Sequence, residues 1–489
     1  MTAECQNKLS TFIEKIKTKK FLYWFFLYSV IVLGIILRVV FYLYDKPFWL
    51  DECKLALNVI NSNNYFIPLA DDQASPALFL YVSKIFYWLS PDKELGLRFL
   101  PLVFSVTSIF VFIKFAKKYL QKPETLLFAV LLFSFAYPLI YYAQDFKQYS
   151  GDVLFFLLIL YSYYFLEKIN SKRMMVIGAV LYSLLFYMSY ASFFAEFGIF
   201  MTLLLFNPKQ FRKLLYMFIP IVLSAIAFYI CYKNVISIDM LISFWDTGFL
   251  TTDINSDFLL FKNIFKYSFA NWIPFIIFGV SLLCAVVKDS KNKNMYPILL
   301  SLLSAMLLSY LKIYPIHSRV SLFLIPVFII FLVKWIDFFN LKNKYIYFAA
   351  LGVFVFYIMN PIIIKDYNKI FKRNFENFED ISTPLKTAVK MAKKDDIFII
   401  AERNNALYNY YKQDFIIKNP VITERIIISE DEYIENLKSY TKGKVYYLIF
   451  AHNKHKDKRF KNIYKWAKKQ KNFYCKKDRY NNAVIRFEL

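Results

Sequence analysis

Three absences narrow the class of this protein. Its cysteines show no paired spacing, so neither a disulfide framework nor a zinc motif is visible. The first apolar run, residues 21–44, is long for a signal-peptide core and has no small-residue cleavage site after it, so we expect an uncleaved transmembrane helix. No internal repeat or low-complexity linker is found. A bridge between Cys53 and Cys475 could still form outside the cytoplasm.

Acidic residues are scarce relative to basic ones. The chain has 36 Asp and Glu against 61 Lys and Arg, which gives a formal net charge of +25. A strongly basic chain can bind nucleic acid, but here the basic residues fall mostly in short clusters between apolar segments. That pattern is typical of membrane topology signals. We therefore expect no nucleic-acid partner.

Hydrophobic residues are abundant. They make up 58% of the 489 residues, and aromatic residues make up 21%. Soluble domains average about 45–50% apolar residues. The excess predicts an α-helical polytopic membrane protein whose immediate partner is the lipid bilayer.

Basic clusters and apolar segments alternate along residues 1–360. Lysines before residue 21 should keep the N-terminus in the cytoplasm. Later apolar segments predict about 11 transmembrane helices, within a range of about 10–13, and a long extracytoplasmic loop over residues 233–266. The last span, near residue 359, leads out of the cytoplasm. We expect a multi-pass protein of the cell inner (cytoplasmic) membrane.

The composition changes after residue 360. Strand patterns occur over residues 396–401, 421–428, 445–450 and 483–487, with helical patterns between them. Residues 361–489 are therefore predicted to form a small extracytoplasmic α/β domain, while residues 1–360 form the transmembrane domain.

Two adjacent carboxylates, Asp51 and Glu52, directly follow the first transmembrane helix. Residues 51–60 carry apolar side chains at helical spacing, which predicts a short helix lying at the membrane interface. A second short apolar helix is predicted to end near Trp88. The pair is thus expected just outside the bilayer, where it could either act on a substrate or cap the interfacial helix.

The predicted topology brings four polar clusters to the extracytoplasmic side. Charges near membrane depth are costly, so they are usually paired or functional. For any single residue, snorkelling or structural pairing explains the charge equally well. Convergence of acids and bases on one side favours a functional site. The clusters are Asp51 with Glu52; Arg98; Asp145, Lys147, Tyr149 and Asp152; and Lys312, His317 and Arg319.

These residue types suit group transfer to a hydroxyl. A carboxylate can act as general base, and cationic side chains can stabilise charge that develops on a departing phosphate. The pair Asp51 and Glu52 could alternatively hold a divalent cation, the one cofactor the sequence suggests. His317 could be a metal ligand, although a lone histidine more often packs or forms hydrogen bonds.

The sequence resembles one known family at these residues. Leu50-Asp51-Glu52, followed by Leu55-Ala56, resembles the acidic first-loop motif of the bacterial family 39 glycosyltransferases, which are similar to protein O-mannosyltransferases and lipid A aminoarabinose transferases. Four later segments resemble further motifs of that family in the same order: residues 75–81, 97–101, 142–149 and 318–326. The resemblance covers roughly the first 330 residues.

The resemblance implies a GT-C fold and a reaction. Such enzymes transfer a sugar, with inversion, from a polyprenyl-phosphate donor to an extracytoplasmic cell-envelope acceptor, which can be a lipid, a glycan or a protein. Asp51 would be the general base or orient the acceptor, Glu52 would support it, and the second acid would be Asp145 or Asp152. The donor phosphate would be bound by Arg98, Lys147, Tyr149, His317 and Arg319.

The sequence departs from the family pattern at two places. Lys147 stands where arginine is common, and it keeps the charge but loses the bidentate fork. Gln73, Ala74 and Ser75 replace the more usual basic-Pro-Pro lead.

Two other functions are weighed against the transferase. A transporter or flippase for a lipid-linked sugar usually has related halves and charges near the bilayer midplane, whereas these charges cluster on one side. A non-catalytic membrane scaffold would tolerate neutralisation of Asp51 and Glu52.

Overall fold

The chain divides into two compact units that do not follow the sequence order. The computed structural model describes residues 19–489 apart from 167–170, 209–210, 233–242, 289–291, 339–343, 373–377, 425–429, 452–457 and 479–481. The first unit, here called the membrane unit, comprises Met1–Tyr44, Asn64–Pro68 and Ala74–Lys372. The second, here called the C-terminal unit, comprises Asp45–Asn63, Leu69–Gln73 and Arg373–Leu489. The first loop therefore belongs to the same unit as the C-terminal residues.

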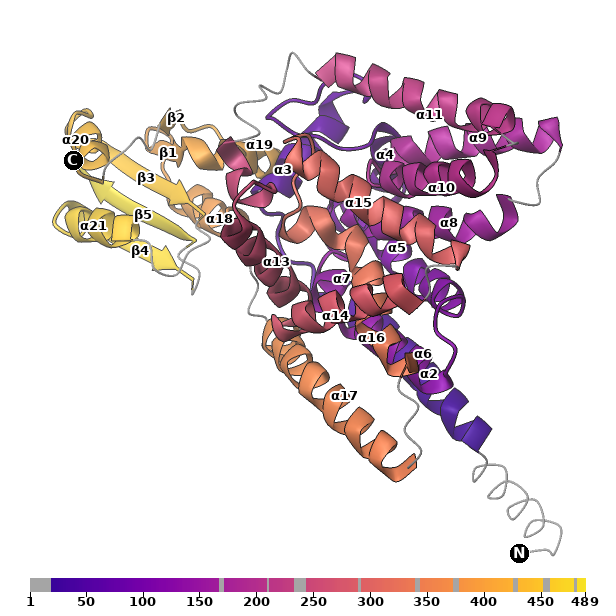
Figure 1. Cartoon of the computed structure of the whole chain (residues 1–489). Coiled ribbons are helices and arrows are strands. Elements are labelled where there is room, and N and C mark those ends of the chain that lie inside the picture. The colour runs from indigo at the N-terminus through magenta and orange to yellow at the C-terminus, as the bar shows by residue number, and fades with distance from the viewer. Residues whose placement is uncertain are drawn as a thin grey trace, which may run out of the picture. The chain divides into compact units, whose positions relative to one another are not determined.

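The membrane unit is helical throughout its described residues (Figure 1). Its main helices are α2 (Lys19–Tyr42), α4 (Ala77–Leu89), α5 (Lys93–Ala116), α6 (Pro123–Phe135), α7 (Tyr137–Tyr141), α8 (Tyr149–Leu166), α9 (Lys172–Met188), α10 (Ser192–Phe206), α11 (Phe211–Tyr232), α13 (Ile254–Phe269), α14 (Ile273–Lys288), α15 (Tyr296–Tyr310), α16 (Ile325–Phe338) and α17 (Lys344–Asp366). Short 3-10 helices include η2 (Asp246–Gly248) and η4 (Ser318–Leu324).

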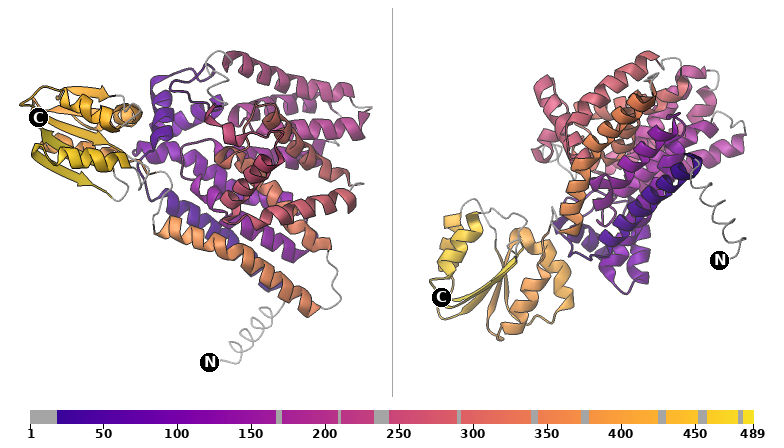
Figure 2. Two further views of the ribbon diagram at one scale, coloured as in Figure 1. Left: turned by 60° about the vertical axis from the view of Figure 1, so that its left-hand side comes forward. Right: turned by 90° about the horizontal axis from the view of Figure 1, so that it is seen from below.

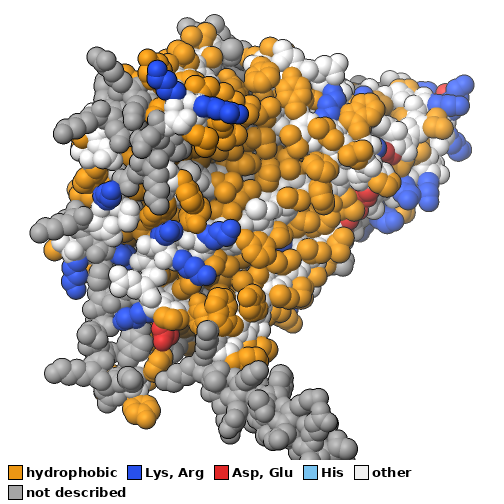
Figure 3. Space-filling view, turned by 90° about the vertical axis from the view of Figure 1, so that its right-hand side faces the viewer, with side chains coloured by type: hydrophobic (Ala, Val, Ile, Leu, Met, Phe, Trp, Pro, Cys, Tyr) orange, Lys and Arg blue, Asp and Glu red, His pale blue; other side chains and the backbone are white. Residues whose placement is uncertain are grey.

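Several of these helices can cross a membrane. Within the described residues, 5 are long and apolar enough, or up to 6 if the pair α13 and α14, bent by 108°, counts as one span. Four further apolar helices are shorter. Figure 3 shows hydrophobic side chains over most of one face of the molecule, as expected for a surface in contact with lipid. The chain is a multi-pass membrane protein; the number of 11 spans stays a prediction.

Buried polar groups tie the first helices together. Arg38 of α2 is fully buried, and its guanidinium donates to the Ser105 hydroxyl at 2.8 Å and to the backbone oxygens of Gly34 and Ser134 at 2.9 and 2.8 Å. The small residues Gly34 and Ser134 also allow α2 and α6 to pack closely, since a Cβ on Gly34 would lie 2.8 Å from the Ser134 Cβ.

Helix α13 lies in the segment that was predicted as a long extracytoplasmic loop. Residues 254–266 were expected to be part of it, but they belong to α13. Asp253 starts this helix because its carboxylate accepts hydrogen bonds from the backbone N–H groups of Asn255 and Ser256 at 3.1 and 3.2 Å. The buried residues of α13, including Leu260, Ile264 and Phe265, recur at helical spacing.

The C-terminal unit contains a five-stranded mixed sheet. The strands are β1 (Ile397–Ala401), β2 (Val421–Glu424), β3 (Val445–Phe450), β4 (Lys471–Lys477) and β5 (Ala483–Glu488), in the order β2-β1-β3-β5-β4. Strand β1 is parallel to β2 and β3, whereas β5 is antiparallel to β3 and β4. Figure 2 shows helices on both sides of this sheet. The α/β expectation is confirmed, but β4 was missed.

Helices complete the core of this unit. They are α18 (Ser382–Met391), α19 (Asn405–Tyr411), α20 (Glu430–Lys438), α21 (Lys458–Ala467) and, from the first loop, α3 (Leu50–Asn61). Leu437 of α20 and Ile463 of α21 pack with Ile399, Leu448 and Ile485 of three adjacent strands. Neither Cys53 nor Cys475 forms a disulfide in the described residues, so the structure does not contain the bridge considered from the sequence.

The packing of Gly198 between α10 and α15 yields a stability test. A Cβ on Gly198 would meet the Ser301 hydroxyl and lie 2.5 Å from the Pro297 backbone oxygen of α15, whereas a Cβ on Gly279 of α14 would meet nothing within 4 Å among the described residues. We expect Gly198→Ala to destabilise the protein by about 1–3 kcal/mol through overpacking. Gly279→Ala should be neutral or stabilise it by up to about 1 kcal/mol. Thermal unfolding of both purified variants in one detergent measures the difference, and equal melting temperatures would contradict this packing.

Candidate active site

The first-loop acids lie at the start of α3, in the C-terminal unit. The helix begins because Trp49 is extended and the Glu52 carboxylate accepts the Trp49 backbone N–H at 3.4 Å. Acids in the first turn also complement the positive end of the helix dipole. Glu52 is fully buried, whereas Asp51 is only partly buried. The two neighbours thus have different environments: Glu52 serves its own helix, and Asp51 remains reachable from solvent.

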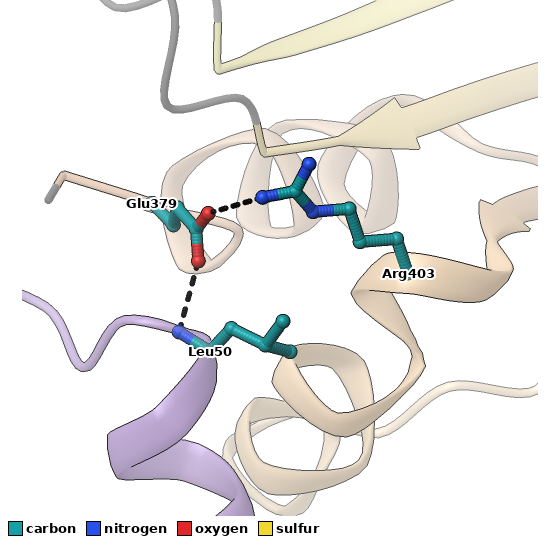
Figure 4. Close-up of polar contacts among 3 residues, drawn as sticks. All are labelled: Leu50, Glu379 and Arg403. Carbon is teal, nitrogen blue, oxygen red and sulfur yellow. Dashed lines mark hydrogen bonds and ion pairs between the residues drawn. The ribbon is translucent and has the colours of Figure 1, made fainter. Parts of the chain in front are cut away.

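Helix α3 is held by two segments of the C-terminal residues. The Phe48 backbone N–H donates to the Tyr411 hydroxyl at 2.7 Å, and the Phe48 ring packs against Tyr410 of α19 at 5.3 Å between centroids. The Leu50 backbone N–H donates to the Glu379 carboxylate at 2.9 Å (Figure 4). The first residues of α3 are therefore fixed by contacts far away in the sequence.

The second-loop residues gather around Tyr142 in the membrane unit. The Tyr267 hydroxyl donates to the Tyr142 hydroxyl at 3.2 Å, and the Tyr149 ring contacts the Tyr142 ring edge-on at 4.9 Å. Burial raises the pKa of Tyr142 well above its usual value; Tyr267 and Asp145 raise this pKa further, whereas Arg319 lowers it. These effects require Asp145 and Arg319 to lie close to this hydroxyl. Three predicted residues, Asp145, Tyr149 and Arg319, are thus brought together.

Asp152 has other polar neighbours than Asp145. Its carboxylate accepts a hydrogen bond from the Ser189 hydroxyl at 2.6 Å, which links the first turn of α8 to the end of α9. Burial raises the pKa of Tyr314 well above its usual value, and Asp152 and Tyr149 raise it further. Asp152 is therefore near Tyr314 and Ser189, while Asp145 is near Tyr142.

The third-loop residues His317 and Arg319 are organised by Trp245. The Arg319 guanidinium lies over the Trp245 ring at 5.6 Å, and the rings of Trp245 and His317 are 5.8 Å apart. The Ile316 backbone N–H donates to the Gly248 oxygen at 2.7 Å and fixes the loop. Burial lowers the pKa of His317, and the positive charge of Arg319 lowers it further, so His317 is neutral at pH 7.

Two further predicted cations are buried in the membrane unit. Arg98 of α5 is fully buried, and Lys147 is 6% exposed. The Lys147 backbone N–H donates to the Asp145 backbone oxygen at 2.7 Å, so the chain makes a tight turn between these two residues. Buried charges in such a setting are paired or functional.

The sequence missed two charged residues near these clusters. Lys365 of α17 donates to the Tyr267 backbone oxygen at 3.0 Å and lies over the rings of Tyr137 and Tyr267 at 4.9 and 5.2 Å. A lysine at the outward end of a predicted span is an exception to the positive-inside pattern, and that exception could have drawn attention to it. The second residue, Glu379, carries no local signal in the sequence.

A chelating site for a metal ion is poorly supported. Among the described residues, no group of three or more His, Cys, Asp and Glu side chains could hold a metal ion. Asp51 and Glu52 are adjacent on α3, and adjacent helical residues do not face each other. Glu52 is moreover engaged with the Trp49 backbone. This pair does not fit the divalent cation considered from the sequence.

The predicted residues divide between the two units. Asp51 and Glu52 belong to the C-terminal unit, and all the others belong to the membrane unit: Arg98, Asp145, Lys147, Tyr149, Asp152, His317 and Arg319. The predicted site residues therefore fall into two groups, one in each unit.

Comparison with known proteins identifies the fold. No protein-family model matches the sequence. No curated protein matches it either. Among solved structures, ArnT from Cupriavidus metallidurans bound to undecaprenyl phosphate has a TM-score of 0.55 at 9% identity, over 96% of this chain and 98% of that chain.

An archaeal protein is also similar. The oligosaccharyltransferase AglB from Archaeoglobus fulgidus, in complex with an inhibitory peptide and a dolichol-phosphate, has a TM-score of 0.52 at 10% identity, over 92% of this chain and 71% of that chain. In the apo oligosaccharyltransferase from the same organism, the match spans 65% of that chain, slightly less than two thirds. The expectation of a GT-C fold with a small C-terminal sheet is confirmed.

The burial of His317 and the nearby charge of Arg319 predict how His317 titrates. We expect its imidazole to take up a proton only below the ordinary pKa of about 6.5. Arg319→Gln should move this pKa upward, because a nearby positive charge is removed. The chain has only 3 histidines, so nitrogen-15 histidine NMR of the protein in bilayers, with His317→Gln for assignment, can follow it. Titration of wild-type His317 at or above 6.5 would contradict the environment described.

Proposed function

We propose that this protein is an integral-membrane glycosyltransferase that moves a sugar, with inversion, from a polyprenyl-phosphate donor to an extracytoplasmic acceptor. The observation that carries this proposal is the match in fold, over nearly the whole of both chains, to ArnT bound to undecaprenyl phosphate. AglB, which is described with a dolichol-phosphate, supports the same donor class. The motif order of the family 39 glycosyltransferases agrees with this assignment. The sugar and the acceptor are left open.

The membrane unit is proposed to bind the donor phosphate. Arg319 is the first candidate, because its guanidinium is held over Trp245 and close to Tyr142, and a guanidinium matches phosphate oxygens with two donors. Lys147 and Arg98 are buried cations of the same unit and would add positive charge. His317 is neutral at pH 7, so it would contribute a hydrogen bond rather than a charge.

Asp145 is proposed as the second acid in preference to Asp152. Asp145 acts electrostatically on the same hydroxyl, that of Tyr142, as Arg319 does. It could therefore orient the phosphate-binding cation. Asp152 is engaged with the Ser189 hydroxyl and joins two helices, which suits a structural role.

Asp51 is proposed as the general base. It is partly exposed at the start of a helix whose other first-turn acid, Glu52, is buried and occupied by the backbone. Asp51 would accept the proton of the acceptor hydroxyl as the hydroxyl oxygen attacks the anomeric carbon, and polyprenyl phosphate would leave. Positioned general bases typically contribute about 10²–10⁴-fold to a rate. The N-terminus is proposed to be cytoplasmic and Asp51 extracytoplasmic, in line with the charge pattern of the loops.

Substitution of the two first-loop acids separates their proposed roles. We expect Asp51→Asn to lower kcat by about 10²–10⁴-fold, because the base is lost. Glu52→Gln should instead lower thermal stability while leaving kcat within about tenfold, because the amide can still accept a hydrogen bond from Trp49. The assay uses protein in nanodiscs, a panel of sugar-loaded undecaprenyl phosphates, and envelope extract as acceptor, and it measures release of undecaprenyl phosphate. Wild-type turnover by Asp51→Asn would refute the assigned base.

Binding of undecaprenyl phosphate itself tests the donor site without knowledge of the sugar. We expect Arg319→Gln to weaken binding by about 10–100-fold, as for loss of a charged hydrogen bond. Arg319→Lys should retain part of the affinity, because it keeps the charge without the fork. Lys312→Gln is the matched control, since its side chain lies over Phe249 at 5.1 Å. Titration in nanodiscs measures all three, and equal affinities would contradict the assignment.

A further inference from the structure

Glu379 is a buried acid of the C-terminal unit that has no role in the site as described so far. It lies 329 residues after Leu50 in the chain, yet its Oε2 accepts the Leu50 backbone N–H at 2.9 Å. Its Oε1 pairs with the Arg403 guanidinium at 3.5 Å (Figure 4). The Glu379 side chain is 4% exposed, whereas that of Arg403 is 54% exposed. A buried carboxylate is therefore held between a helix start and a surface arginine.

The charged groups around Glu379 belong to two segments of the same unit, the first loop and the residues that follow Glu379. Burial raises the pKa of Glu379, and the negative charge of Asp51 raises it further; the hydrogen bond from Leu50 lowers it, as do Arg403 and Lys46. Asp51 is thus close enough to act on Glu379. An exposed arginine contributes little to such a pair. The hydrogen bond from the Leu50 N–H lowers the pKa of this carboxyl more than Arg403 or Lys46 does.

The position of the Leu50 N–H explains what this contact does. The first N–H groups of a helix have no partner within the helix and need an acceptor from elsewhere. Leu50 is the first residue of α3 and immediately precedes Asp51. A hydrogen bond to Leu50 therefore fixes the backbone from which the Asp51 side chain projects.

We infer that Glu379 is a positioning residue for Asp51, through which the residues after 372 take part in the transfer reaction. This role rests on the function proposed for Asp51. Glu379 does not touch the substrate; it holds the first turn of α3, and Arg403 and Lys46 balance its charge. Residues after 372 thus help to orient the proposed base.

The test compares Glu379→Gln and Glu379→Ala with Asp380→Asn in the full-length protein. Asp380 is the adjacent buried acid, but its carboxylate accepts hydrogen bonds from Ser382 and Thr383 at the start of α18. We expect Glu379→Ala to lower kcat by about tenfold, because no acceptor remains for the Leu50 N–H, and Glu379→Gln, whose amide oxygen can still accept this N–H, to lower it by less; the KM for the polyprenyl-phosphate sugar should be unchanged in both. Asp380→Asn should leave both constants near wild type. Wild-type kcat in both Glu379 variants would overturn the inference.

Combination with Asp51→Asn separates this inference from the proposed function. If Glu379 acts through Asp51, Glu379→Ala should cause no further loss of kcat in an Asp51→Asn background. A full additional loss would overturn the positioning role. If Asp51→Asn alone transfers sugar at the wild-type rate, the base assignment fails first, and the role inferred for Glu379 fails with it.

Reactivity of Cys53 distinguishes positioning from simple undocking of α3. Cys53, the fourth residue of α3, is fully buried and is not in a disulfide, and its thiol donates to the Phe48 backbone oxygen at 3.8 Å. In a background where the other four cysteines are serine, we expect Glu379→Ala to leave Cys53 as slow to react with a maleimide as in wild type. Fast labelling together with loss of kcat would show that α3 has come away, and would overturn positioning in favour of a purely structural role.

Discussion

The cost of burying charge governs both units of this protein. An ionised group placed in an apolar interior loses its hydration, so the fold must supply hydrogen-bond partners. Arg38 shows how this determines architecture: its guanidinium takes acceptors from α2, α5 and α6, and the three helices must stay adjacent to provide them. The same requirement recurs wherever charge enters the apolar interior.

The candidate site follows the same rule. In the membrane unit, aromatic rings and hydroxyl groups surround the ionised residues, as where Trp245 lies against Arg319 and Tyr142 lies close to Asp145. Rings can stabilise a cation while they keep water out. In the C-terminal unit, the Glu379 carboxylate is stabilised by a helix N–H group. Each solution fixes a side chain in place, which is what binding a charged lipid head group or orienting a base requires.

Local patterns in the sequence predicted much of this, and distant contacts explain what they missed. The helix expected over residues 51–60 is α3, because its apolar spacing is a local signal. Strand β4 was missed because its lysines and exposed positions give an edge strand without a hydrophobic face. Helix α13 was missed because the charged residues of the segment 233–266 suggested a loop, although buried apolar residues recur at helical spacing along the helix. Glu379 could not be found, because its partner is 329 residues away.

The division of the chain into units changes how the first loop should be understood. In sequence order, Asp51 looks like part of the transmembrane half, and the C-terminal α/β residues look like an appendage. The contacts of Phe48 with Tyr411 and of Leu50 with Glu379 join the loop to those residues instead. A base must hold its geometry while the lipid-facing helices adjust to their surroundings. Holding the start of α3 by Glu379 and by Tyr410 and Tyr411 of α19, in the unit that contains the packed sheet, provides that rigidity, because the sheet core does not depend on lipid contacts.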